Sequence, residues 1–236
     1  MKAAVLKMLV LVLVTSLLAG CGGGGGNTAV NSSNVYISGT VNEGMWPISG
    51  GGTQLQYMAS LVVATSSFNG PAISNASVNI NGTQIAYDAT LNRFQGVVVP
   101  DAAGKFVLTV VANGETHTAT AIAMTTRPVI TVPNPFNAAQ ANTISWSAVG
   151  GVVSGATPVS YYLEVVDYNN YGATRIAYKI STASLNALVP ANATNPTTPY
   201  YASIYAGYIS TMIATAASGS NFGVSASSDV AYFTPQ

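Results

Sequence analysis

Short segments in which apolar and polar residues alternate, separated by turn residues, recur along most of this chain. The clearest case runs from Val78 to Tyr87, where Asn81-Gly82 separates two alternating segments. Asn-Gly fits the tightest hairpin turn, because both central positions of that turn take a positive φ. Asn113-Gly114 repeats the signal further along the chain. Beyond residue 33 no stretch has a sustained helical period with caps, so the sequence predicts an all-β fold.

The first 20 residues follow a different pattern. Lys2 and Lys7 flank a short basic region, and an apolar run from Met8 to Leu18 follows it. A basic start, an apolar core and small residues before a cut site are typical of an export signal. A membrane-spanning helix needs roughly 20 apolar residues, whereas this run is shorter and ends in glycine. We therefore predict a signal peptide over 1–20, cleaved between Gly20 and Cys21.

The residues around the cut site, Leu18-Ala19-Gly20-Cys21, resemble the lipobox of bacterial lipoproteins. The resemblance implies a diacylglyceryl thioether on Cys21, with fatty chains such as palmitate, and a membrane partner through that lipid. Residue 22 is Gly rather than Asp, which implies the cell outer membrane if the host envelope has two membranes. Such an anchor tethers a chain without a spanning helix. An ordinary secretory signal with an incidental cysteine is the alternative.

Charged residues are scarce, at 6% of the chain, with seven basic and seven acidic side chains. Removal of the signal takes Lys2 and Lys7, which leaves five basic residues against seven acidic ones. Neutralising phosphates needs clustered Lys and Arg, so we expect no nucleic-acid partner. Cys21 is the only cysteine, so the mature chain has no disulfide and no CxxC motif. The lone His117 suggests no zinc site, and we expect no metal and no cofactor.

Composition and prolines divide the remainder of the chain. Residues 21–33 are rich in Gly, Asn, Ser and Thr, which predicts a flexible tether behind the lipid. Arg127-Pro128, followed by Pro133 and Pro135, interrupts the strand pattern and marks a domain boundary. The sequence therefore predicts two tandem antiparallel β-sandwich domains, over 34–126 and 127–236.

Both predicted domains resemble known β-sandwich families. The first resembles bacterial Ig-like or carboxypeptidase-regulatory-like modules, over 38–41, 70–78 and 104–110. The second resembles a fibronectin type III domain, at Ile144 and Trp146 and at the Leu-x-x-Leu-x-Pro corner over 185–190. This resemblance implies a buried Trp146 and a Tyr200 hydroxyl that ties back to the preceding corner, with Tyr201 as the alternative. It implies a fold and carries over no catalytic residues.

Candidate chemistry is sparse. A catalytic triad would need His117 with a hydroxyl nucleophile and a carboxylate, and Glu115 lies close by in the sequence. The Thr-rich alternating context of His117 favours a polar strand residue instead. The acidic residues match no glycosidase-like pair. Asp167, Asn169 and Asn170 have nearly the spacing of calcium ligands, but only one of them is charged. We therefore predict that the protein is not an enzyme and has no catalytic residues.

Tyrosines are concentrated in one part of the chain. Nine of the 13 fall between Tyr161 and Tyr208, and Tyr168 and Tyr171 lie in a predicted hairpin loop. Tyrosine offers rigid, amphipathic contact area at low entropic cost, so these two are candidates for a binding surface. Such a surface could serve a protein or a glycan ligand. Ordinary sheet composition is the alternative explanation.

Taken together, these features predict a lipid-anchored protein of the bacterial cell envelope. Its two β-sandwich domains would display a non-catalytic binding or assembly surface. Two alternatives remain open. The chain could be an accessory subunit of a larger envelope or surface assembly, or a hydrolase with an unrecognised site.

Overall fold

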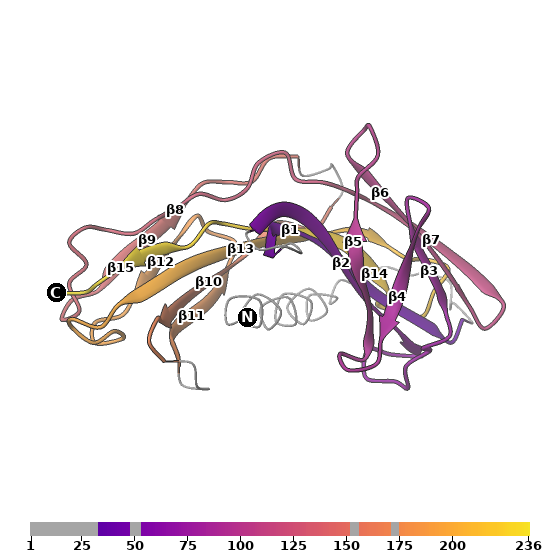
Figure 1. Ribbon diagram of the computed structural model, residues 1–236, viewed down its shortest axis with the longest axis horizontal. Helices are drawn as coiled ribbons and strands as arrows, with labels where there is room; N and C mark the ends of the chain where they lie inside the picture. Colours follow the sequence, from indigo (N-terminus) through magenta and orange to yellow (C-terminus); the bar gives the residue numbers. More distant parts are fainter. Residues whose placement is uncertain (1–32, 48–52, 152–155, 171–174) are drawn as a thin grey trace. The chain divides into compact units, whose positions relative to one another are not determined.

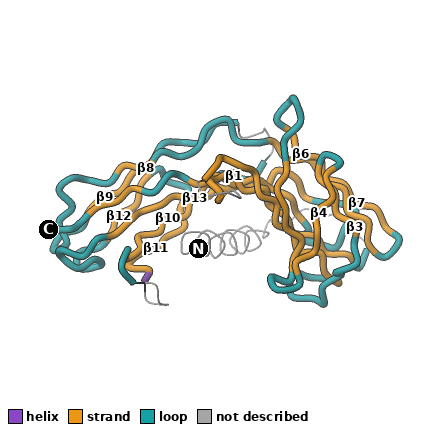
Figure 2. The backbone as a smooth tube through the Cα atoms, in the orientation of Figure 1, coloured by secondary structure: helices purple, strands orange, loops and turns teal. Residues whose placement is uncertain are grey.

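The computed structural model describes residues 33–47, 53–151, 156–170 and 175–236. These residues form strands and loops, apart from a 3₁₀ turn at Arg175, and no α-helix occurs among them (Figure 2). No helix within the described ranges has the length and hydropathy needed to cross a membrane. The prediction of an all-β sandwich fold is confirmed. The predicted signal peptide, the tether up to residue 32 and the cleavage site at Gly20 and Cys21 lie outside the described residues.

Contacts divide the chain into two units. Unit 1 combines the residues up to Ala123 with Gly151–Thr157 and Gly207–Ser225, and unit 2 holds the remainder. This division differs from the predicted ranges 34–126 and 127–236, because it assigns two later segments to unit 1. The physical reason is strand pairing, since the strand that begins at Asn221 is a neighbour of the strand that begins at Val35. Side chains support that pairing, as Asn42 Nδ2 donates to Ser225 Oγ at 3.1 Å.

Unit 1 is built from antiparallel strands in two layers (Figure 1). Strands β14, β1, β2 and β5 form one layer, and β3, β6 and β7 form the other. Strand β4 pairs with β5 on one side and with β3 on the other, so it joins the layers. The bounds are β1 Val35–Pro47, β2 Thr53–Thr65, β3 Ser77–Ile80, β4 Thr83–Asp88, β5 Arg93–Val98, β6 Lys105–Ala112, β7 Glu115–Ile122 and β14 Asn221–Ser227.

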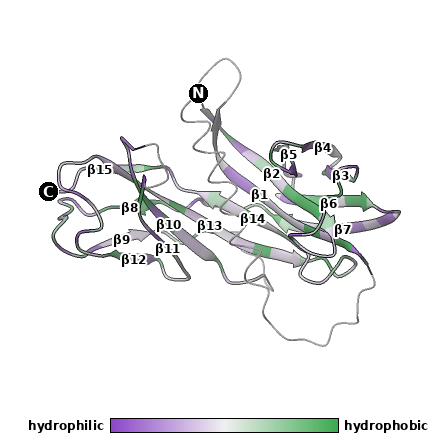
Figure 3. Cartoon of the chain, turned by 90° about the horizontal axis from the view of Figure 1, so that it is seen from below, coloured by the Kyte–Doolittle hydropathy of each residue, from purple (hydrophilic) through white to green (hydrophobic). Residues whose placement is uncertain are grey.

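The core of unit 1 follows the alternation seen in the sequence. Strand β6 buries every second residue, including Phe106 and Leu108, and Figure 3 shows the hydrophobic character of this strand. Tyr57 of β2 meets Phe106 with ring centroids 5.3 Å apart, which places β2 and β6 face to face. Burial of such aromatic and aliphatic side chains is the main force that holds the two layers together.

The predicted hairpin turns are confirmed. Asn81 and Gly82 have φ of 50° and 79°, and Asn113 and Gly114 have φ of 52° and 80°. Both positions of each turn are therefore left-handed, as a type I′ turn requires. β1 continues through Gly44 to Pro47 and pairs with β2 along its whole length.

Unit 2 is a second antiparallel sandwich. One sheet contains β11, β10 and the part of β13 up to Ala206, with β15 also paired to β13, and the other has the order β12, β9, β8. The rest of β13, from Gly207, belongs to unit 1. Between them lie buried side chains such as Ile144, Trp146 and Leu163. The bounds are β8 Ile130–Thr131, β9 Asn142–Trp146, β10 Ser160–Asp167, β11 Ile176–Thr182, β12 Asn186–Val189, β13 Tyr200–Met212 and β15 Ala231–Phe233.

Two expectations from the fibronectin-like pattern can be checked in unit 2. Trp146 is 5% exposed, so its predicted place in the core is confirmed. The hydroxyl of Tyr200 accepts a hydrogen bond of 3.0 Å from the backbone N–H of Asn195. Tyr200 rather than Tyr201 therefore ties back to the segment that precedes its strand.

Candidate functional site

Tyrosines gather on the side of the β10–β13 sheet that faces away from the unit 2 core. Tyr161, Leu163 and Val165 of β10 belong to the buried core, where Tyr161 contacts Trp146. Successive residues of a strand point to opposite faces, so Tyr162 and Glu164 lie on the other side. On β13 the same alternation places Tyr201, Ser203 and Tyr205 on one face.

The accessible part of this face is a group of three rings, which we call the tyrosine patch: Tyr168, Tyr201 and Tyr232. Tyr168 is 48% exposed and Tyr232 is 66% exposed, whereas Tyr201 is 8% exposed and forms the floor. The ring of Tyr232 contacts Tyr168 edge to face, with centroids 5.7 Å apart, and Tyr201 with centroids 6.2 Å apart. Such edge-to-face pairs are favourable beyond the area they bury.

Strand pairing fixes the positions of these rings. Tyr201 and Tyr232 are directly opposite each other in the β13–β15 ladder, so their side chains lie on the same face. The backbone N–H of Tyr168 donates to the carbonyl of Pro199 at 2.9 Å, which holds the end of β10 beside the start of β13. The patch is therefore held by backbone hydrogen bonds and not only by ring contacts.

The loop that carries Tyr168 uses its own acidic residue as a turn element. Asp167 Oδ1 accepts hydrogen bonds from the backbone N–H groups of Asn169 at 2.9 Å and Asn170 at 3.2 Å. That arrangement is an Asx turn, which accounts for the Asp-x-Asn-Asn spacing without a cation. No group of metal-binding side chains occurs among the residues that the structure describes. Tyr171, the second predicted surface residue, lies outside the described residues.

Next to the patch, the same sheet face contains a polar cluster. Tyr162, Glu164 and Ser203 of this cluster are buried, and Tyr205 is half-buried. Glu164 alternates along β10 with the core residues Leu163 and Val165, yet it is itself only 5% exposed. Ser203 Oγ donates to the hydroxyl of Tyr205 at 3.3 Å. The Tyr162 hydroxyl influences Glu164 electrostatically, yet it meets no group with hydrogen-bonding geometry in the described part of the chain.

Burial and neighbouring charges set the protonation of this face. Burial raises the pKa of Glu164, while the nearby Tyr162 hydroxyl, Arg175 and Lys179 act in the opposite direction. Burial also raises the pKa of Tyr201 to about 12, with Arg175 opposing and Glu164 reinforcing the shift. The shift runs away from neutral pH, so it does not alter the ordinary role of the Tyr201 hydroxyl as both a hydrogen-bond donor and an acceptor.

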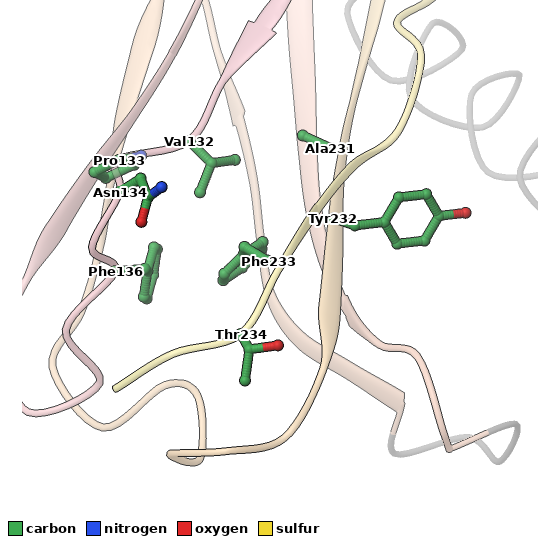
Figure 4. A pocket seen from close by; sticks show the side chains of 8 residues that line it. All are labelled: Val132, Pro133, Asn134, Phe136, Ala231, Tyr232, Phe233 and Thr234. Carbon is green, nitrogen blue, oxygen red and sulfur yellow. The ribbon is translucent and has the colours of Figure 1, made fainter.

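A cavity of about 400 Å³ lies on the other side of β15. Its walls come from the segment after β8 and from β15, and Phe136 contacts Phe233 there with ring centroids 4.7 Å apart. Figure 4 shows Phe233 directed toward Phe136 and Tyr232 directed away from it. The cavity therefore shares β15 with the tyrosine patch, but the Tyr232 ring belongs to the patch.

The candidate triad residue His117 is placed in unit 1. It is 2% exposed on β7, with Nδ1 3.2 Å from Thr215 Oγ1 and Nε2 3.3 Å from Glu115 Oε2. The imidazole therefore lies between a hydroxyl and a carboxylate, but its Nε2 makes no hydrogen bond in the described part of the chain, unlike the imidazole of a triad. The neighbouring contacts indicate a structural role, since Thr211 Oγ1 donates to Thr120 O at 2.6 Å and Tyr208 Oη to Ile122 O at 2.7 Å. Side chains from 208–215 thereby cover the edge of β7.

We expect Thr215→Val to lower the free energy of unfolding by about 1–3 kcal/mol, because the buried imidazole of His117 loses its hydroxyl partner. Chemical denaturation followed by intrinsic fluorescence measures this change. Thr118→Val on the exposed face of the same strand is the matched control and should change stability by less than about 0.5 kcal/mol. A Thr215→Val protein as stable as the parent would mean that the contact contributes nothing to the fold.

The sequence identified part of this arrangement. Tyr168 is exposed as predicted, but its ring partner Tyr232 was not singled out, since it lies far along the chain. Two local signals could have identified the patch. One is the alternation that places Tyr201 on the same face of β13 as Tyr205, and the other is the Tyr-Phe pair at 232–233. Neither signal says that β15 pairs with β13, and that pairing is what brings the rings together.

No protein-family model matches the chain, and no curated protein matches it. Among solved structures it is similar to a cytokine receptor complex, at 10% identity and a TM-score of 0.31, over 83% of this chain and 99% of that one. It is also similar to chicken CNTN1 FN1–FN3 domains, at 9% identity and a TM-score of 0.25, over 83% of this chain and 64% of that one. Scores this low carry no argument about function, and the sandwich architecture rests on the strand pairing described above.

Proposed function

We propose that this protein is a non-catalytic binding module of the bacterial cell envelope, which engages its ligand through the tyrosine patch. The observation that carries the proposal is the pair of exposed rings, Tyr168 and Tyr232, held edge to face above Tyr201. Single exposed apolar residues are common on protein surfaces. Contiguous exposed aromatic side chains on a rigid scaffold are typical of recognition sites.

Rigidity supports the same proposal. Tyr201 and Tyr232 are opposite each other in a strand ladder, and Tyr168 is held by its backbone bond to Pro199. Rings that are already ordered lose little conformational freedom when a ligand binds, so more of the contact energy appears as affinity. A patch of this kind can bind a ligand without any catalytic group.

The anchor is the second part of the proposal. Cys21, in Leu18-Ala19-Gly20-Cys21, would carry the lipid, and residues 22–33 would connect it to β1. At about 3.3 Å per residue, an extended tether of this length reaches up to about 40 Å. That reach would let unit 1 and unit 2 stand clear of the lipid headgroups. In a host with two membranes we place the protein on the outer membrane.

We expect the double change Tyr168→Ser with Tyr232→Ser to abolish ligand binding without unfolding the protein. Tyr168 is 48% exposed and Tyr232 is 66% exposed. The melting temperature should therefore shift by no more than about 2 °C, because exposed substitutions change stability by less than about 0.5 kcal/mol. Interface tyrosines commonly contribute about 2 kcal/mol or more, so affinity should fall at least about 30-fold. The measurement is quantitative co-purification from envelopes solubilised in mild detergent, beside a thermal melt.

Leu188→Ser is the matched control, since Leu188 is a large side chain of the same unit and is 58% exposed on β12. The control should retain every partner of the parent protein. Loss of the same partners from both variants would place the binding surface elsewhere. A large drop in the melting temperature of the double variant would show that the rings serve the fold and not a ligand.

A further inference from the structure

The chemistry of the tyrosine patch restricts the class of ligand, and the inference made here rests on the proposed function. The first restriction is area. A stable protein interface buries about 800 Å² on each partner, whereas an aromatic side chain supplies about 150–250 Å² in total. Tyr201 is already buried, and Tyr168 and Tyr232 are only partly exposed. The patch therefore suits a ligand that presents a few flat units and not a broad protein surface.

The second restriction is charge. The ionic groups that act on the Tyr201 hydroxyl are Arg175 and Glu164, and they shift its pKa in opposite directions. Lys179 is opposite Glu164 in the β10–β11 ladder, so this carboxylate has cationic neighbours on its own sheet face. A charged ligand would be attracted by one of these groups and repelled by another. The balance favours a ligand without net charge.

The third restriction is hydrogen bonding. Each tyrosine hydroxyl of the patch can both donate and accept a hydrogen bond. Asn169 is exposed in the loop beside Tyr168, and its amide adds a donor and an acceptor. Hydrogen-bond donors and acceptors that lie close together suit a ligand whose own hydroxyl groups both donate and accept hydrogen bonds. An apolar ligand would leave these groups without partners, which is costly when they are desolvated.

From these three features we infer that the tyrosine patch binds a neutral glycan. The C–H faces of pyranose rings would stack on Tyr168 and Tyr232, and sugar hydroxyls would bond to the tyrosine hydroxyls and to Asn169. Because the two aromatic rings are nearly perpendicular, at 81°, each would contact a different sugar unit. The site therefore fits a chain with a bend between successive units better than a flat ribbon.

Affinity electrophoresis of the purified full-length protein tests this inference. The gels contain one soluble polysaccharide each: dextran, laminarin or galactomannan as neutral probes, and alginate or hyaluronan as anionic probes. We expect at least one neutral probe to retard the protein. We expect Tyr168→Ser and Tyr232→Ser each to weaken that retardation at least about fivefold, since a ring contact is worth roughly 1 kcal/mol or more. Tyr232→Phe should retain most of the effect, and Leu188→Ser all of it.

Salt separates a neutral ligand from an ionic one. Retardation by the neutral probe should be unchanged between about 50 and 500 mM NaCl, because screening weakens only contacts between charges. The inference is overturned if no neutral probe retards the protein, if retardation is insensitive to the patch variants, or if only the anionic probes act and salt abolishes their effect. If the double patch variant loses a protein partner while no glycan binds, the glycan assignment fails and the proposed binding function stands.

Discussion

Trp146→Ala should lower the free energy of unfolding by about 3–5 kcal/mol, the usual cost of removing a buried tryptophan. The ring is 5% exposed and contacts Tyr161, with centroids 5.9 Å apart. The backbone around it is also paired on both sides, with Ile130 of β8 and with the carbonyl of Leu185. Neighbours held in this way cannot collapse into the space, so the cavity term adds to the lost burial.

Denaturant unfolding of the two proteins measures this loss. A domain has about 5–15 kcal/mol of stability in total, so the variant should be poorly populated in its folded form at 37 °C. Trp146→Phe should recover part of the loss, because it refills most of the cavity. Val129→Ala is the exposed control from the same unit, since Val129 is 67% exposed. A loss below about 1 kcal/mol for Trp146→Ala would show that this ring is not part of the unit 2 core.

The features that the sequence predicted well are those set by neighbouring residues. Asn81-Gly82 and Asn113-Gly114 specify their turns because left-handed φ values at two adjacent positions exclude most other pairs. The alternation in β6 and β7 predicts which residues are buried, since a strand turns successive side chains to opposite faces. The core position of Trp146 was instead implied by the fibronectin type III resemblance, and the burial pattern of β9 agrees with it.

The features that it missed depend on pairing between distant segments. The segment 207–225 was assigned to the second domain, but it belongs to unit 1, where Ile37 N–H donates to Ser220 Oγ at 3.0 Å. A local pattern shows that a segment is a strand and says little about which strand it joins. The same holds for β1, which continues past Gly44 because its partner β2 pairs with it as far as Pro47.

The candidate site shows the same division between local and long-range information. Exposure of Tyr168 followed from its place in a loop, and this prediction is confirmed. Its pairing with Tyr232 depends on β15 joining β13, which brings residues from the end of the chain to the end of β10. The burial of Glu164 could not be predicted, because alternation alone assigns that position to the solvent side.

Cys21→Ser should remove the protein from the membrane completely, and this is the largest effect that we expect of any single change. A serine hydroxyl cannot form the diacylglyceryl thioether, and each buried methylene of the lipid contributes about 0.8 kcal/mol to anchoring. One acyl chain holds a protein only reversibly, whereas two give stable attachment. Removal of the whole diacyl group should therefore release nearly all of the protein from the membrane.

Detergent phase partitioning and metabolic labelling with a fatty acid measure the membrane-bound and the lipidated fractions of the protein. Asn27→Ser in the tether is the matched control and should leave both unchanged. A Cys21→Ser protein that is cleaved and still enters the detergent phase would contradict the prediction of a lipid anchor on Cys21. The signal peptide would then be an ordinary secretory signal.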